Sequence, residues 1–103
     1  MRTANFGMAI RGRETINSLA TAVGLTITHI PMLDPKCRCA IVQPVGGNIR
    51  FTLDGATDPV AATTGHILVQ NSFLELWEQE LAKFKCINDG GTAKLEVTYY
   101  GEG

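Results

Sequence analysis

Polar and apolar residues alternate most cleanly in residues 48–54. Ile49, Phe51 and Leu53 are each separated by one polar residue, which is the period of a strand with one buried face. Asp54 and Gly55 then favour a turn, because glycine accepts a positive φ angle and aspartate bonds its own following backbone. A loop of small residues leads to a second apolar stretch at 65–70. The pattern therefore predicts two strands joined through a turn and a loop.

Other parts of the chain also have strand character. Residues 25–30 are rich in β-branched side chains, and residues 37–43 form a short apolar run bounded by prolines. Residues 88–91 (Asn-Asp-Gly-Gly) are a strong turn signal, after which residues 93–100 alternate between apolar and polar. Residues 14–23 fit either a strand or a helix, because β-branched residues and good helix formers are mixed there.

Residues 72–86 support two conflicting interpretations. Ser72 followed by Glu75 would cap a helix. The large apolar residues of this segment recur at helical spacing: Phe73, Trp77, Leu81 and Phe84. The alternative is a hairpin with strands at 73–77 and 83–87 around a turn at 78–81. We favour the hairpin, because strands flank the segment closely on both sides and all loops then stay short.

The chain of 103 residues is long enough for one domain. About seven strands with regular turn signals predict an all-β fold, a single small β-sandwich or a barrel-like domain of antiparallel strands. We assign that domain to residues 14–103. Residues 1–13 predict an extended N-terminal arm, since two glycines interrupt any helical pattern there; a disordered terminus is the alternative.

Charge is distributed unevenly along the chain. The net charge is only −1, which by itself indicates neither nucleic acid nor an anionic membrane as a partner. However, residues 1–13 hold three arginines and no acid, whereas residues 14–103 hold six basic and ten acidic residues. A basic arm preceding an acidic body suits contact with a neighbouring subunit, where the opposite charges would meet.

The apolar runs and the cysteines indicate the cellular compartment in which the protein is made. No run reaches the ~18–20 apolar residues of a membrane span, and the N-terminus lacks the residue order of a secretory signal. The three cysteines are an odd number, and two of them are only two positions apart. This argues against a disulfide framework and indicates synthesis in a reducing cytoplasm.

Each group of candidate metal ligands in the sequence has a simpler explanation than metal binding. Cys37, Cys39, Cys86 and a histidine could supply four zinc ligands, but zinc sites usually separate paired ligands by two to four residues. On one strand, the first two cysteines would share a face and act as small buried hydrophobic residues. Asp54 and Asp58 could bind calcium, yet a calcium site gathers six or more oxygens. We predict no metal and no other cofactor.

Catalytic groups are not arranged for chemistry in this sequence. His29 and His66 have no obvious acid partner, and no motif marks a nucleophile, so we predict a protein that is not an enzyme. A binding role for the aromatic residues is a separate hypothesis. Trp77, Tyr99 and Tyr100 could form a platform on which sugar rings stack, although a core aromatic and a strand-end pair explain them more simply.

Residues 47–68 contain the runs Ile-Arg-Phe and Leu-Asp-Gly, one proline, and Gly-His-x-Leu. This pattern resembles that of a group of small proteins encoded among the virion genes of tailed bacteriophages, and the resemblance is strongest in this segment. It continues in Phe-Leu-Glu-Leu at 73–76, in residues 81–87 and in the closing residues 90–100. The strand followed by Asp-Gly is also similar to β-sandwich modules appended to sugar-cleaving enzymes.

The resemblance implies a non-enzymatic structural component of the virion, present in many copies as a head decoration or in a neck or tail ring. Its partners would be copies of itself and capsid, portal or tail proteins, without direct contact with nucleic acid or a membrane. It would be made in the host cytoplasm and end in the virion. The alternative is a carbohydrate-binding module for cell-surface attachment. The interface residues that we predict come from the arm and from the loop at 54–65: Arg2, Phe6, Met8, Ile10, Arg11, Asp54, Asp58, Pro59 and His66.

Overall fold

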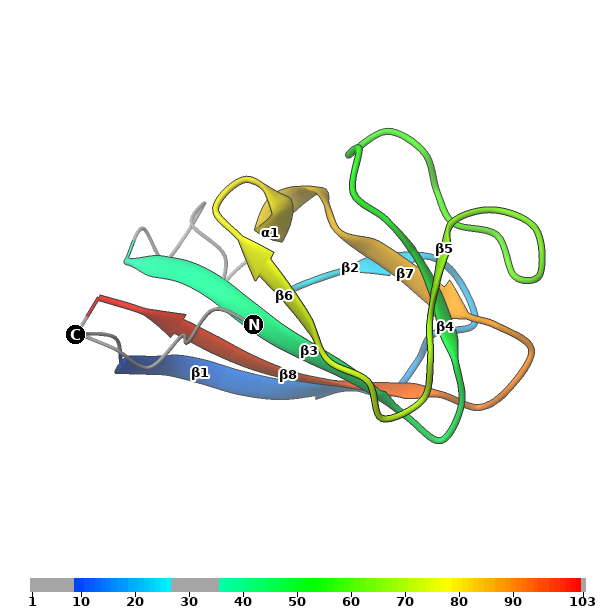
Figure 1. The fold of residues 1–103 in the computed structure, drawn as a ribbon, viewed down its shortest axis with the longest axis horizontal. Helices are drawn as coiled ribbons and strands as arrows, with labels where there is room; N and C mark the ends of the chain where they lie inside the picture. Colours follow the sequence, from blue (N-terminus) through cyan, green and yellow to red (C-terminus); the bar gives the residue numbers. More distant parts are fainter. Residues whose placement is uncertain (1–8, 27–35, 103) are drawn as a thin grey trace.

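The computed structural model describes residues 9–26 and 36–102, which form a β-sandwich of two four-stranded antiparallel sheets (Figure 1). The first sheet has the order β1 (Ala9–Ile16), β8 (Lys94–Gly101), β3 (Cys37–Val45) and β6 (Leu74–Trp77). The second has the order β2 (Val23–Gly24), β7 (Lys85–Asn88), β4 (Ile49–Thr52) and β5 (His66–Leu68). One helical turn, α1 (Glu80–Lys83), joins β6 to β7. The predicted all-β sandwich is confirmed.

The core lies between the two sheets and follows the period-2 patterns. Leu95, Val97 and Tyr99 of β8 are fully buried, whereas the two residues between them are half-buried. Ile49 and Phe51 of β4 contribute from the opposite sheet. Side chains on alternate positions of a strand point to the same face, so the alternation predicted for 48–54 and 93–100 is the alternation of the core.

The N-terminal strand β1 changes the boundary expected for the arm. Ala9–Ile16 pairs with β8 along its whole length, with a bulge between Ile10 and Gly12. Residues 9–13, which we assigned to the arm, therefore lie in the first sheet, and residues 1–8 lie outside the described residues. Of residues 14–23, which fitted either a strand or a helix, residues 14–16 belong to β1 and Val23 to β2, whereas residues 17–22 between them form neither strand nor helix.

A carboxylate on β1 ties this strand to its neighbours. Glu14 accepts hydrogen bonds from the Tyr99 hydroxyl of β8 and from the hydroxyl and N–H of Thr26, which follows β2. Burial, followed by the contact with Glu14, raises the pKa of Tyr99 well above its ordinary value. The Tyr99 hydroxyl therefore stays protonated and keeps donating to Glu14.

A β-bulge in β3 corrects the prediction that two cysteines share a face. Cys37 pairs with Gly101 and Cys39 with Tyr100, so β3 advances by two residues while β8 advances by one. This extra residue reverses the alternation. Cys37 consequently belongs to the core cluster, whereas Cys39 lies on the opposite face, also buried, between its cross-strand neighbours Tyr100 and Trp77.

The segment 72–86 contains the two predicted strands, but they do not form a hairpin. β6 pairs with β3 in the first sheet, and β7 pairs with β2 and β4 in the second. α1 carries the chain across the sandwich, where facing sheets are typically about 10 Å apart. Its residue Leu81 is buried in the core, and Phe84 directly after it is also buried. The long helix is wrong as well, because only four residues are helical.

Candidate functional site: the β4–β5 loop and the open edge

The loop between β4 and β5 begins with a turn built on Asp54. The Asp54 carboxylate accepts hydrogen bonds from the backbone N–H groups of Ala56 (2.9 Å) and Thr57 (2.8 Å). The Thr52 hydroxyl donates to the Thr57 carbonyl at 2.6 Å. Hydrogen bonds from the Thr57 side chain, then from the Thr57 and Ala56 N–H groups, lower the pKa of Asp54 to about 2. The carboxylate is therefore used to shape the turn.

We expect this turn to loosen when Asp54 is protonated. Because the folded pKa lies below the ordinary value, its contribution is complete above about pH 4 and is lost as the pH falls towards 2. NMR signals of the Ala56 and Thr57 amides should shift with a midpoint near pH 2. The same signals should show no such titration in Asp54→Asn, which keeps an acceptor but has no carboxylate. A wild-type midpoint near pH 4 would contradict the assigned hydrogen bonds.

An ion pair holds the second half of the loop. Arg50 Nε lies 2.9 Å from Asp89 Oδ1, and only 17% and 15% of these side chains are exposed. Asp89 Oδ1 also accepts the Ala62 N–H at 2.8 Å, and Arg50 Nη1 donates to the Gly65 carbonyl at 3.2 Å. These contacts, first the Ala62 N–H and then Arg50, lower the pKa of Asp89. The pair therefore fixes the loop at both of these backbone positions.

The middle of the loop is closed by a tight turn and a buried proline. Val60 and Thr64 exchange backbone hydrogen bonds, each of 3.0 Å. Pro59 is fully buried, so its ring packs the loop against the sandwich and presents no surface to a partner. Asp58 is exposed and lies 2.8 Å from Lys85 Nζ, an exposed pair of the kind that adds little stability.

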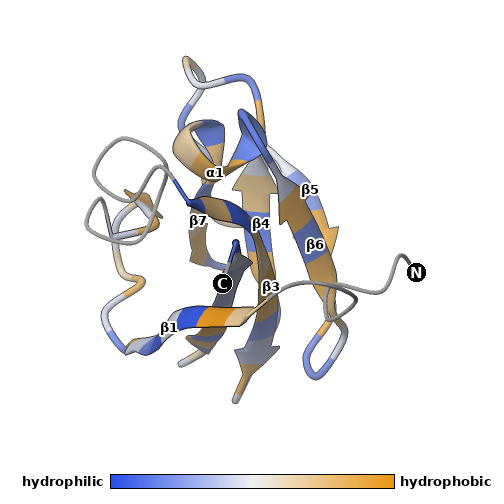
Figure 2. Cartoon of the chain, turned by 90° about the vertical axis from the view of Figure 1, so that its left-hand side faces the viewer, coloured by the Kyte–Doolittle hydropathy of each residue, from blue (hydrophilic) through white to orange (hydrophobic). Residues whose placement is uncertain are grey.

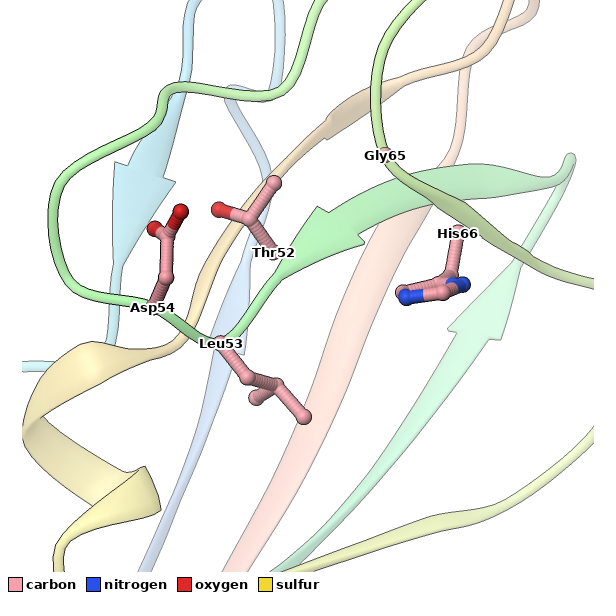
Figure 3. A pocket seen from close by; sticks show the side chains of 5 residues that line it. All are labelled: Thr52, Leu53, Asp54, Gly65 and His66. Carbon is pink, nitrogen blue, oxygen red and sulfur yellow. The ribbon is translucent and has the colours of Figure 1, made fainter.

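A shallow depression lies between the start of the loop and β5 (Figure 3). It has a volume of about 360 Å³ and is lined by Thr52, Leu53, Asp54, Gly65 and His66. Asp54 and His66 lie at opposite ends of it in Figure 3, and within the described residues no hydrogen bond joins them. The His66 ring packs against Phe51, with centroids 5.6 Å apart. Both side chains thus line the same depression, but they do not form an acid–base pair.

Thiols and carboxylates do not converge on a metal position in the part of the chain that the structure describes. No three side chains of His, Cys, Asp or Glu gather there closely enough to hold an ion, and His29 lies outside the described residues. All three cysteines are buried thiols. Burial raises the pKa of Cys86 to about 12, which keeps it protonated. In residues 9–26 and 36–102, no helix has the length and apolar character needed to cross a membrane.

The three aromatic residues considered for sugar binding separate into two environments. Tyr99 is fully buried in the core. Tyr100 and Trp77 are half-buried on the outer face of the first sheet, on either side of Cys39. The Trp77 indole N–H donates to Glu75 Oε1 at 2.9 Å. The structure therefore brings two of the three residues to one face.

The predicted interface residues do not form one surface. Ile10 is 65% exposed and lies on β1, the edge of the first sheet opposite β6. Arg11 is half-buried at the β1 bulge, Asp54, Asp58 and His66 are exposed, and Pro59 is buried. Arg2, Phe6 and Met8 lie outside the described residues. Of the loop residues, Asp54 and His66 both line the depression beside the second sheet, whereas Ile10 lies in the first sheet.

An apolar surface that we did not predict lies on β5 and the connection after it. Ile67, Val69 and Phe73 are 50%, 55% and 60% exposed. β5 is the edge of the second sheet, β6 is the edge of the first, and the short connection between them keeps both edges on one side of the sandwich (Figure 1). Figure 2 shows apolar segments on this side. We call residues 65–73 the open edge.

Alternation could have identified Ile67 as the outward-facing residue of its strand, but not the position of that strand at an edge. The position at an edge becomes visible only in the strand order. β5 pairs with β4 on one side, and no described strand pairs with its other side.

Comparison with known proteins adds no relative to this picture. No family model, no curated protein and no solved structure matches the chain. The described residues define the class of the protein as a small β-sandwich with an apolar edge at β5.

Proposed function

We propose that this protein is a non-enzymatic structural component of a tailed-phage virion, present in many copies and acting through contacts between subunits. The open edge is the observation that carries the proposal. It combines exposed apolar side chains with a side of β5 that pairs with no described strand, and exposed strand edges pair readily with other chains. The resemblance of residues 47–68 to virion proteins supports the same function, because this segment contains β4, the loop and β5.

The rigid β4–β5 loop supports a role in contacts rather than catalysis. Asp54, Arg50 and Asp89 use their charges on backbone groups of the loop itself. Little conformational entropy is then lost when a neighbouring subunit docks, which is the advantage of a preorganised surface. A stable interface buries roughly 1,200–2,000 Å² in total, and symmetric repetition adds many smaller contacts in one particle. Head decoration and a neck or tail ring are both such arrangements.

The arm remains part of the proposal with a revised boundary. Ile10 and Arg11 belong to β1, so a subunit-spanning arm would be limited to residues 1–8. Those residues contain Arg2, Phe6 and Met8, and their role in assembly stays a prediction.

A carbohydrate-binding module is the second candidate. The observation that favours it is the placement of Trp77 and Tyr100 on one outer face, where two rings could contact successive sugars. Trp77 is the single tryptophan of the chain, so its fluorescence reports directly on this face. A saturable fluorescence change with cell-surface glycans would favour the module over a purely structural part.

The virion proposal predicts that the chain is found in purified particles. Virions produced from the genome that encodes it should contain the protein after density-gradient purification, in a fixed ratio to the major capsid protein. Quantitative mass spectrometry measures that ratio, and a non-virion protein of the same genome serves as the control for contamination. Particles with a full set of capsid, portal and tail proteins but without this chain would contradict the proposal.

A further inference from the structure

We propose that β5 pairs with β5 of a second copy of this chain, antiparallel and across a two-fold axis at Ile67. This inference rests on the proposed subunit-contact function and names the partner of the open edge. β5 pairs with β4 on one side, and no described strand pairs with its other side. An added strand would continue the second sheet of one copy into the second sheet of the other.

The other described sheet edges are protected against such pairing. β1 has a bulge and three charged residues, which are Arg11, Arg13 and Glu14. β6 contains Glu75, and β2 is only two residues long. Charges, bulges and short length are the usual devices that prevent edge-to-edge association. β5 has neither a charged residue nor a bulge, and it is followed by the exposed apolar residues of the open edge.

The absence of charge favours a second copy as the partner. At a two-fold axis each residue meets its own counterpart, so any charged side chain there would face the same charge. From Pro59 to Leu74 the sequence has no Lys, Arg, Asp or Glu. Asp58 and Glu75 flank this stretch on either side. The neutral stretch thus coincides with the part of the chain that self-pairing would bring closest to the axis.

The register follows from the faces of the strand. Leu68 of β5 is buried towards the core, and Ile67 points to the outer face. Opposite residues of an antiparallel pair lie on the same face of the sheet. A two-fold axis perpendicular to the sheet leaves the cores of both copies on the same face of the continuous sheet. In this arrangement, outward-facing residues of one copy pair with outward-facing residues of the other. In the three residues of β5, this places Ile67 opposite Ile67 of the second copy.

Hydrogen bonds hold the edge in the conformation that pairing needs. Arg50 Nη1 donates to the Gly65 carbonyl before β5, the Asn48 side chain accepts the Gln70 N–H (2.8 Å), and the Pro44 carbonyl accepts the Asn71 N–H (2.8 Å). The backbone on both sides of β5 is therefore fixed by β3, β4 and the connection between them. The edge loses little conformational freedom when a second copy binds.

Ile67→Lys tests the proposal directly. The purified wild-type chain should form dimers in a concentration series by light scattering or sedimentation equilibrium. Two lysines at the axis should raise the dimer Kd by about 100-fold or more. Ile10→Lys is the matched control, because Ile10 is 65% exposed on the opposite sheet edge, and it should dimerise like the wild type. Circular dichroism and thermal melting should show both variants folded.

Ile67→Cys tests the register. The three native cysteines are buried, so the new thiol would be the exposed one. Mild oxidation should produce a 67–67 disulfide-linked dimer, identified by mass spectrometry, because directly opposite residues of an antiparallel pair have Cα atoms about 4.5–5.5 Å apart, within the roughly 4.4–6.8 Å that a disulfide spans. Ile10→Cys should produce none, or far less.

A wild-type chain that stays monomeric, an Ile67→Lys variant that still dimerises, or equal cross-linking of the two cysteine variants would each overturn the β5 pairing. The function can survive that result: a monomeric chain found in purified particles would leave the virion role standing without this pairing. A β5-dependent dimer that is absent from particles would reject the virion role and leave the pairing standing.

Discussion

Gly101→Ala should destabilise the protein by about 3 kcal/mol or more, because β8 and β3 approach too closely at this position to admit a Cβ atom. A Cβ built on Gly101 would lie 2.0 Å from the Lys36 carbonyl oxygen and 2.8 Å from the Cys37 Cα. Both contacts are to backbone, which cannot rotate away as a flexible side chain does. The two strands would have to separate where Gly101 pairs with Cys37. Urea unfolding monitored by circular dichroism measures the loss.

Gly91→Ala is the control for this substitution. Its Cβ would meet nothing closer than the Gly47 Cα at 3.8 Å, and Gly91 is exposed in the turn before β8. We expect a change within about 0.5 kcal/mol, as for ordinary surface substitutions. Similar losses in both variants would mean that the close approach of Gly101 to residues 36–37 does not limit the fold.

The strands with clean alternation could be predicted because burial of one face produces alternating apolar and polar residues within the strand itself. β4 and β8 each face the core with every second residue, and neither needs information from distant parts of the chain. The alternation ends where a strand gains an extra residue. The bulge between Cys37 and Cys39 depends on how β3 pairs with β8, so a pattern read along β3 alone put both cysteines on one face.

Strand partners were harder to predict than strands. Residues 74–77 and 85–88 are strands, as expected for a hairpin, yet they belong to different sheets. Local sequence shows that both segments suit an extended conformation, but a hairpin and a crossing between sheets use equally short connections. The buried Leu81 and Phe84 mark the crossing. These two residues had also supported the alternative helix, because a single buried helical turn spaces its apolar residues in the same way as a long helix.

The candidate site shows the same division between local and non-local information. The Asp54 turn follows from two neighbouring residues, and it is present. The Arg50–Asp89 pair joins residues from β4 and from the turn after β7, so no sequence window contains it. The open edge also depends on strand order, because Ile67 is an exposed edge residue only if nothing pairs beyond β5.

Phe84→Ala should cost about 3–5 kcal/mol of unfolding free energy, a typical loss for removing a buried phenylalanine ring. Phe84 is 1% exposed, and its ring stacks on Phe51 with centroids 6.0 Å apart and an interplanar angle of 29°. Phe51 in turn contacts His66 at the depression. The cavity would therefore form directly beneath the candidate site, and typical domains have only about 5–15 kcal/mol of total stability to lose.

Phe73→Ala separates this loss of stability from a loss of assembly. Phe73 is 60% exposed on the open edge, so its removal should change the stability of the monomer by no more than about 0.5 kcal/mol. Urea unfolding of both variants, at protein concentrations too low for dimers, gives the comparison. A small loss in Phe84→Ala would show that the core beneath the loop collapses to fill the space. A large loss in Phe73→Ala would show that the open edge already stabilises the isolated subunit, and the argument that its apolar side chains await a second copy would then fail.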